Sequence, residues 1–300
     1  MHTGGSRITP LRAGFCLGYG RIASPLLPRA QVRFYARSFL IEHSKHGLLL
    51  VDTGYGESFW RATARFPSSL YRHLLPVQCR PEDRVIAQLH ERGLNVRDLS
   101  YVILTHFHAD HIGALHDFAE VPWIYRSDSL AALQQMSSWR ALRHGFLHDL
   151  IPFTTPPGSI LLDERSFSSL FKSEGYGERS SPSECEAEPR KDALRRRDLF
   201  GDGSLWVVDL PGHALGHCGL LLPNALMAGE ADHMRRDLFL VGDAAWSQES
   251  LEYGVEPGFL GRWAQQDSKA YRRSFHMLHQ LHSTGEVFCI PTHEVELCIS

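Results

Sequence analysis

The most informative absences in this 300-residue sequence are of paired cysteines, long apolar runs and excess positive charge. The six cysteines are scattered without a Cys-x-x-Cys pair, which argues against a disulfide scaffold and favours reduced thiols. No apolar stretch approaches the ~20 residues that span a bilayer, and the N-terminus lacks a signal-peptide pattern. The net charge of −3 gives no basic footprint for nucleic acid. We therefore expect a soluble, cytoplasmic protein without a membrane or nucleic-acid partner.

The alternation of apolar and polar segments predicts an α/β architecture with covered sheets. We expect one domain over residues 1–300, because the length suits one large domain and no repeat or low-complexity tract divides it. Residues 172–197 are rich in Ser, Glu, Pro and Arg, so we expect a polar surface insertion there. Strands are expected at 32–42, 48–51, 101–104, 121–125, 204–210, 219–222, 237–241 and 287–290. Helices are expected at 81–92, through 115–118, at 127–146 with Trp139 in the core, and at 267–281.

A dense cluster of metal-ligand side chains directly follows the apolar run 101–104. The segment reads Thr105-His-Phe-His-Ala-Asp-His111 and offers His106, His108, Asp110 and His111. Imidazole and carboxylate ligands suit zinc and similar divalent first-row metals. Neighbouring ligands on a short turn can face opposite sides, so the cluster is dense enough to serve more than one ion.

Three later apolar runs each end in a Gly or Pro followed by one further ligand-type residue. These residues are His213, Asp243 and His293. With the first cluster, the chain supplies five histidines and two aspartates at predicted strand ends. That set is sufficient for two metal ions that share one carboxylate.

This pattern resembles the binuclear site of the metallo-β-lactamase-fold hydrolases, over about residues 30–295. The resemblance implies a four-layer αβ/βα sandwich with metals at one edge. It implies that the first metal is bound by His106, His108 and His213. The second would be bound by Asp110, His111 and His293, and Asp243 would bridge both. Asp52, in Val-Asp-Thr-Gly, matches the family's early aspartate, which would orient ligands from behind the site.

The reaction that the resemblance implies is hydrolysis by a hydroxide that bridges two divalent transition-metal ions. Zinc is expected, with iron, manganese or cobalt as alternatives. Asp110 would accept a proton as the intermediate collapses, and Asp243 would hold the two ions. A serine nucleophile is not required, and the sequence has no Gly-x-Ser-x-Gly elbow.

Departures from related families narrow the expected substrate to a lactone or another carboxylic ester. The bridging position holds Asp243 where some zinc β-lactamases carry Cys, so antibiotic hydrolysis is not expected. The pattern is most similar to N-acyl-homoserine lactonases and to glyoxalase-II-type thioesterases. The seven residues after His293 do not resemble a glyoxalase-type extension, which favours the lactonases. However, Trp246 stands where the quorum-quenching lactonases place a tyrosine. It is expected to line the pocket, and His217 to lie beside the ligands without binding metal.

Three alternatives to the lactonase-like hydrolase remain open. The first is thioester hydrolysis of the glyoxalase-II type. The second is phosphodiester cleavage, which the absence of a basic patch disfavours. The third is a non-catalytic binding protein on the same fold, although such a protein would be expected to have lost ligands. A homodimer is compatible with all of these hypotheses.

Overall fold

The computed structural model describes residues 5–167, 169–171 and 194–298. Its strands are β1 (Arg7–Tyr19), β2 (Gln31–His43), β3 (Gly47–Val51), β4 (Val77–Gln78), β5 (Leu99–Ile103), β6 (Trp123–Arg126), β7 (Ile160–Leu162), β8 (Ser169–Phe171), β9 (Leu194–Asp198), β10 (Trp206–Asp209), β11 (Cys218–Met227), β12 (Arg236–Gly242), β13 (Val287–Pro291) and β14 (Glu294–Leu297). Its α-helices are α1 (Gly20–Ala23), α2 (Glu57–Ala62), α3 (Ser69–Leu74), α4 (Val85–Glu91), α5 (Ala109–Ile112), α6 (Ser127–Gln134), α7 (Ser138–Arg143), α8 (Gln248–Tyr253), α9 (Phe259–Ala264) and α10 (Ser268–Thr284).

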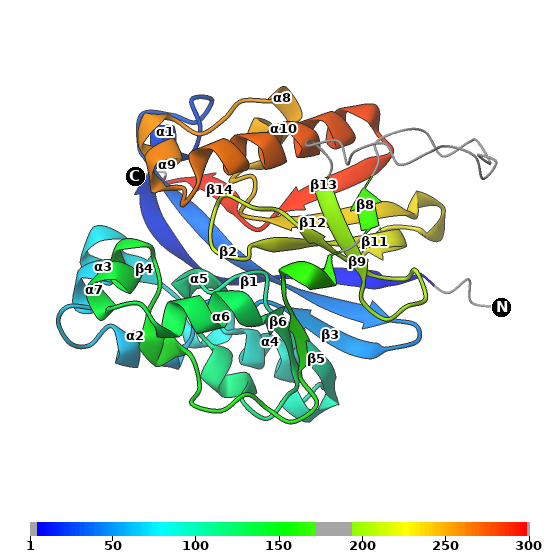
Figure 1. Ribbon diagram of the computed structural model, residues 1–300, viewed down its shortest axis with the longest axis horizontal. Helices are drawn as coiled ribbons and strands as arrows, with labels where there is room; N and C mark the ends of the chain where they lie inside the picture. Colours follow the sequence, from blue (N-terminus) through cyan, green and yellow to red (C-terminus); the bar gives the residue numbers. More distant parts are fainter. Residues whose placement is uncertain (1–4, 168, 172–193, 299–300) are drawn as a thin grey trace.

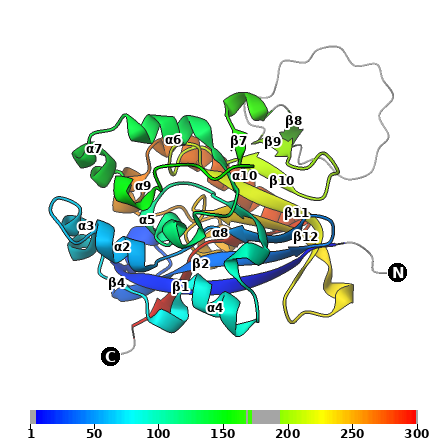
Figure 2. The same cartoon turned by 90° about the horizontal axis from the view of Figure 1, so that it is seen from below.

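The strands form two halves of an extended sheet system. In the first half the order is β7-β6-β5-β3-β2-β1, and β14 and β4 pair with β2 and β1 respectively. In the second half β8, β9, β10 and β11 follow one another, and β12 and β13 extend from β11. The halves meet where Arg7 and Ile8 of β1 pair in parallel with Leu226 and Met227 of β11. The long strands β1 and β2 run side by side through the molecule (Figure 2).

Strand periodicity explains why the two sheets pack face to face with helices outside. In β3, Leu49 and Val51 join a core between the sheets, whereas Leu50 joins a second core under the first set of helices. In β11, Leu220 faces the core between the sheets and Leu221 faces the opposite outer core. Successive side chains on a strand point to opposite faces, so each apolar strand serves two layers.

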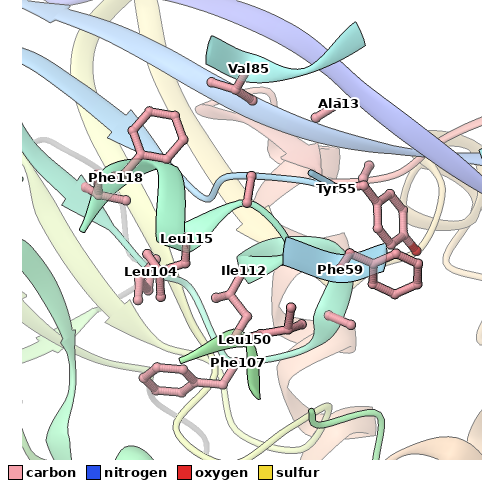
Figure 3. Close-up of a cluster of buried hydrophobic side chains, with 14 of the residues drawn as sticks. Ala13, Tyr55, Phe59, Val85, Leu104, Phe107, Ile112, Leu115, Phe118 and Leu150 are labelled. Carbon is pink, nitrogen blue, oxygen red and sulfur yellow. The ribbon is translucent and has the colours of Figure 1, made fainter. Parts of the chain in front are cut away.

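Helices cover both outer faces, which completes the four layers. Helices α2, α4, α5 and α6 lie on one face, and α8 and α10 lie on the other (Figure 1). Phe59 of α2, Val85 of α4 and Ile112 of α5 converge in the first outer core (Figure 3). Tyr271 and Phe275 of α10 pack in the other outer core. The predicted αβ/βα sandwich is therefore confirmed.

The long N-terminal strand β1 was not predicted from the sequence. Pro10, Gly14 and Gly18 interrupt its apolar pattern, and these residue types are depleted in strands. A register shift between Arg12 and Phe15 shows that β1 includes an irregularity at Gly14, whose φ is +83°. Pairing with β2 along almost its whole length overrides the weak local preference of these residues.

Three further predictions were wrong in their boundaries. The single helix expected at 127–146 is two helices, because the Ser137 side chain accepts a hydrogen bond from the Arg140 amide and starts α7 anew. Trp139 is 57% exposed and does not belong to the core. The expected insertion at 172–197 ends in a strand, since β9 pairs with β10. Residues 172–193 of that insertion lie outside the described residues.

The helix expected at 81–92 is also interrupted: a short 3₁₀ turn over Pro81–Asp83 precedes α4. Within the described part of the chain, no helix is long and apolar enough to cross a bilayer.

Candidate metal centre

The strand ends bring the predicted ligands together in two groups. His106 and His108 follow β5, and α5 carries Asp110 and His111. His213 follows β10, while Asp243 and His293 lie just beyond β12 and β13. The first group is His106, His108, His213 and Asp243, and the second group is Asp110, His111, Asp243 and His293. Within each group the possible ligand atoms lie within 4.8 Å of one another.

Asp243 belongs to both groups, and its position depends on His217 and Gly242. The Asp243 amide donates a hydrogen bond to His217 Nε2 at 2.9 Å. The other ring nitrogen, Nδ1, donates to the carbonyl oxygen of Leu210 at 3.1 Å. Gly242 has φ +56°, and a Cβ there would stand 2.5 Å from His217 Nε2. Both ring nitrogens of His217 therefore contact the main chain, while its lying beside the ligands without binding metal stays a prediction.

Asp52 supports the second group from behind. Its Oδ2 accepts a hydrogen bond from His111 Nδ1 at 2.7 Å, so His111 Nε2 faces the other ligands. The same carboxylate accepts bonds from the amide and the hydroxyl of Thr105 at 2.9 and 2.8 Å. Asp52 is buried and has φ +56°, a left-handed conformation that aspartate tolerates better than most residues. The contact expected for Asp52 is thus present, while its effect on metal binding stays a prediction.

Three other histidines, His106, His213 and His293, are held through Nδ1 by neutral oxygens. Because the Thr105 hydroxyl donates to Asp52, it can accept at 3.1 Å from His106 Nδ1. His213 Nδ1 lies 2.9 Å from Gln265 Oε1, and His293 Nδ1 lies 3.1 Å from the main-chain oxygen of Tyr35. In each ring Nε2 is left to face the ligand group. Such rear contacts fix the tautomer and orientation of metal-binding imidazoles.

The electrostatic environment differs between the two groups. Burial lowers the pKa of His106 well below its ordinary value, and His111 and His108 lower it further. Burial alone would also lower the pKa of His111, but the carboxylates of Asp243 and Asp52 outweigh it and raise that pKa well above its ordinary value. Burial would raise the pKa of Asp243, yet the neighbouring His293 and His111 hold it well below the ordinary range. The potential around His111 therefore favours a positive charge.

Unpartnered buried atoms provide a test of whether metal ions fit these residues. His106 Nε2, His111 Nε2 and Asp243 Oδ1 are buried and make no hydrogen bond among the described residues, although His111 Nε2 lies 3.3 Å from Asp243 Oδ1. Buried polar atoms without partners are rare because they lose their hydration. All three belong to the two ligand groups, and nitrogen and carboxylate donors suit divalent first-row metals. The residues present thus fit two such ions.

Trp246 and Gln265 border the first group. The Trp246 ring stands nearly perpendicular to that of His213, with centroids 5.9 Å apart, and its buried Nε1 has no partner among the described residues. Trp246 was expected here because it lies three residues after Asp243. Gln265 was not predicted, because it belongs to no motif and lies 52 positions from His213. No local pattern in the sequence could have identified it.

Comparison with known proteins identifies the family and several relatives of this chain. The sequence model of the metallo-beta-lactamase superfamily matches residues 32–281. A probable metallo-hydrolase of Mycobacterium tuberculosis is 35% identical over 239 residues, which are 78% of this chain and 64% of that protein. The chain thus spans slightly less than two thirds of that relative. The N-acyl homoserine lactonase AiiA of Bacillus thuringiensis subsp. kurstaki is 31% identical over 125 residues, 41% of this chain and 50% of that protein.

Solved structures share the fold at lower identity. An N-acyl homoserine lactone hydrolase with N-hexanoyl-L-homoserine at its catalytic metal center has a TM-score of 0.63 and 18% identity, and the match covers 97% of this chain and 94% of that one. A probable metal-dependent hydrolase from Staphylococcus aureus has a TM-score of 0.63 and 14% identity, covering 98% and 91%. The match of the superfamily model over residues 32–281 shows that this chain belongs to the metallo-β-lactamase superfamily, whose fold the solved structures share.

Proposed function

We propose that this protein is a dinuclear-metal hydrolase that opens a lactone or cleaves another carboxylic ester. The observation that supports it most directly is the pair of ligand groups that share Asp243 at the joint edge of the two sheets. The names of the relatives, a metallo-hydrolase and an N-acyl homoserine lactonase, support the same reaction class. Zinc is the metal that we propose first, because histidine nitrogen and carboxylate oxygen dominate the donor set.

Two divalent ions bound here would lower the pKa of a coordinated water and polarise the carbonyl oxygen of the substrate. The residues around them have separate tasks. Asp243 holds the groups together, and its buried position leaves it unsuited to moving protons to and from solvent. Asp110 is more exposed, and its Oδ2 lies 3.5 Å from His293 Nε2 and 3.9 Å from His111 Nε2. We assign Asp110 the role of accepting the proton of the attacking water and passing it to the leaving oxygen.

Trp246 limits how closely the substrate resembles that of the quorum-quenching lactonases. An indole can donate one hydrogen bond but cannot accept one or exchange a proton as a phenol does. The half-buried ring stands against His213, where it presents an apolar surface to the first group. We therefore propose a lactone or ester whose acyl or alcohol part differs from that of a homoserine lactone.

The test begins with the metal content of the purified protein, which we expect to be close to two transition-metal ions per chain. The zinc-loaded protein is then assayed in parallel on acyl lactones, simple esters, thioesters and phosphodiesters. Faster turnover of lactones or esters supports the proposal, and a preference for thioesters or phosphodiesters would assign a different substrate class. A folded protein that binds no metal would contradict the proposal as a whole.

Asp110→Asn tests the assigned proton transfer, because the amide cannot accept the proton. We expect the kcat of the zinc-loaded variant to fall by about 10²–10⁴-fold. Asp149→Asn is the matched control, since Asp149 is exposed and belongs to neither ligand group. Metal content is measured for both variants, so that a loss of the second ion is distinguished from a loss of proton transfer. An Asp110→Asn variant that keeps both ions and full activity would exclude this role.

A further inference from the structure

Gln265 is a buried side chain that joins a predicted metal ligand to a surface helix. It lies between α9 and α10 and is 6% exposed. Its Oε1 is 2.9 Å from His213 Nδ1, and its Nε2 donates to the main-chain oxygen of Gly261 in α9 at 2.9 Å. Both polar ends of the amide are therefore engaged, one at the site and one in the helix.

These two contacts determine which nitrogen of His213 carries the proton. The carbonyl oxygen of Gly261 can only accept a hydrogen bond, so the amide nitrogen of Gln265 must face it. Oε1 must then face His213, and an amide oxygen can only accept. His213 Nδ1 consequently carries a proton, which leaves Nε2 as the metal-binding nitrogen, and Nε2 faces His108 Nδ1 at 3.0 Å and Asp243 Oδ2 at 3.2 Å.

Helix α9, whose Gly261 carbonyl accepts the hydrogen bond from Gln265, packs closely on its inner side and is apolar on its outer side. A Cβ at Gly261 would stand 2.2 Å from the main-chain oxygen of Ile22 and 3.2 Å from the Trp246 ring, so only glycine allows this approach. Phe259, Leu260 and Trp263 of the same helix are 76%, 56% and 68% exposed. The Gly261 carbonyl is thus a fixed anchor for Gln265.

We propose that Gln265 is a positioning residue of the first ligand group, which holds His213 in its Nδ1-protonated form and ties its orientation to α9. This inference rests on the proposed function, because it assumes that the first group binds metal. Gln265 does not touch the metal or the substrate. Its effect is to present the Nε2 lone pair of His213 before metal arrives, so that ligand reorganisation does not weaken binding.

The test measures zinc affinity by competition with a chromophoric chelator, starting from metal-free protein. Gln265→Leu removes both hydrogen bonds, and we expect roughly 10–100-fold weaker binding of one of the two ions, the typical effect of losing such a support. Gln266→Leu is the matched control. Gln266 is exposed and contacts the His213 carbonyl only through its own main-chain amide, so its zinc affinities should equal those of the wild type.

Gln265→Glu separates the two hydrogen bonds. A carboxylate still accepts from His213 Nδ1 but cannot donate to Gly261, so this variant should recover most of the lost zinc affinity. Nitrogen-15 spectra of the zinc-loaded proteins give a second measurement: the Nδ1 proton of His213 should be observed in the wild type and in Gln265→Glu, and should exchange faster in Gln265→Leu.

Equal zinc affinities for Gln265→Leu and Gln266→Leu would overturn the inference while leaving the proposed function intact. A wild-type protein that binds no zinc would instead overturn the proposed function. Thermal unfolding of the metal-free variants shows whether they fold. If Gln265→Leu does not fold, Gln265→Met, which has nearly the length of glutamine and also lacks both polar atoms, takes its place with the same expected result.

Discussion

The two ligand groups share Asp243 but differ in charge and in what stands behind them. The first group has three histidines and one aspartate, whereas the second has two histidines and two aspartates. Behind the first group lie neutral oxygens of Thr105 and Gln265. Behind the second lies the buried carboxylate of Asp52.

This difference concentrates negative charge at the second group. It explains why the pKa of His106 is lowered by burial and by neighbouring imidazoles, while the pKa of His111 is raised by Asp243 and Asp52 despite burial. A cation entering the second group would meet a more negative potential than one entering the first. We therefore infer that charge mainly stabilises an ion in the second group, and that the orientation of neutral imidazoles mainly stabilises one in the first.

The largest expected effect follows from removing the residue that the groups share. Asp243→Ala should lose both ions and reduce turnover by roughly 10³-fold or more, because each group would lose its common carboxylate. Metal analysis and the esterase or lactonase assay measure this. Asp232→Ala, at an exposed aspartate, should leave both unchanged. Retention of two ions by Asp243→Ala would show that the groups do not depend on a shared ligand.

Single-group variants test whether the two groups are separate. His106→Ala should leave only the ion of the second group, and His293→Ala only that of the first, so metal content should fall from two ions to about one in each. Quantitative metal analysis after dialysis against a weak chelator distinguishes them. If either substitution removes both ions, the groups bind cooperatively and cannot be compared as independent sites.

Asp52 and Gln265, which hydrogen-bond to ligands of different groups, should each affect the binding of a different ion. Asp52→Asn removes the negative charge behind His111 while keeping a residue that tolerates φ +56°. It should weaken the second ion by roughly 10–100-fold and leave the first nearly unchanged. This is the opposite pattern to that expected for Gln265→Leu, and chelator competition on both variants compares them directly. If both variants bind the same ion more weakly, the charged Asp52 and the neutral Gln265 do not support different ions.

Thr105 contacts both groups, and its loss should give the smallest effect. Its hydroxyl donates to Asp52 and accepts from His106, so Thr105→Val should cost about 1 kcal/mol in the free energy of unfolding and weaken both ions slightly. Thr63→Val is the control. The buried Thr63 hydroxyl, at the C-terminal end of helix α2, donates a hydrogen bond to the Phe59 carbonyl and contacts no ligand group. The control should lower stability alone, as measured by denaturant unfolding and zinc titration.

The residues of the candidate site were predictable because they follow apolar strands directly. A strand such as 101–104 is evident from its composition, and His106 or Asp110 at its end can be read without knowing the fold. The fold class followed from the same alternation and from the family resemblance. Strand β1 could not be predicted, since Pro10 and Gly14 weaken its local signal and its pairing with β2, β4 and β11 stabilises it.

Contacts between distant segments could not be derived from local patterns. Gln265 resembles any polar residue between two helices, and its role depends on the tertiary position of His213. Trp139 was wrongly placed in the core because its spacing suggested a buried stripe, whereas a new helix begins at Ser138 and turns the ring outward. The single-domain organisation and the homodimer remain predictions.

The candidate centre lies where the ends of both sheets meet, and this has a consequence for unfolding. His108 and His213 come from different sheets and are 105 positions apart in the chain. An ion held by both would act as a reversible crosslink that closes a loop on the order of 100 residues, which by the chain-entropy relation for crosslinks corresponds to about 4–5 kcal/mol. The sheets could then separate only after the ion had left. The lifetime of the folded protein would depend on the free metal concentration around it, so a chelator that removes the ion would accelerate unfolding as well as stop turnover.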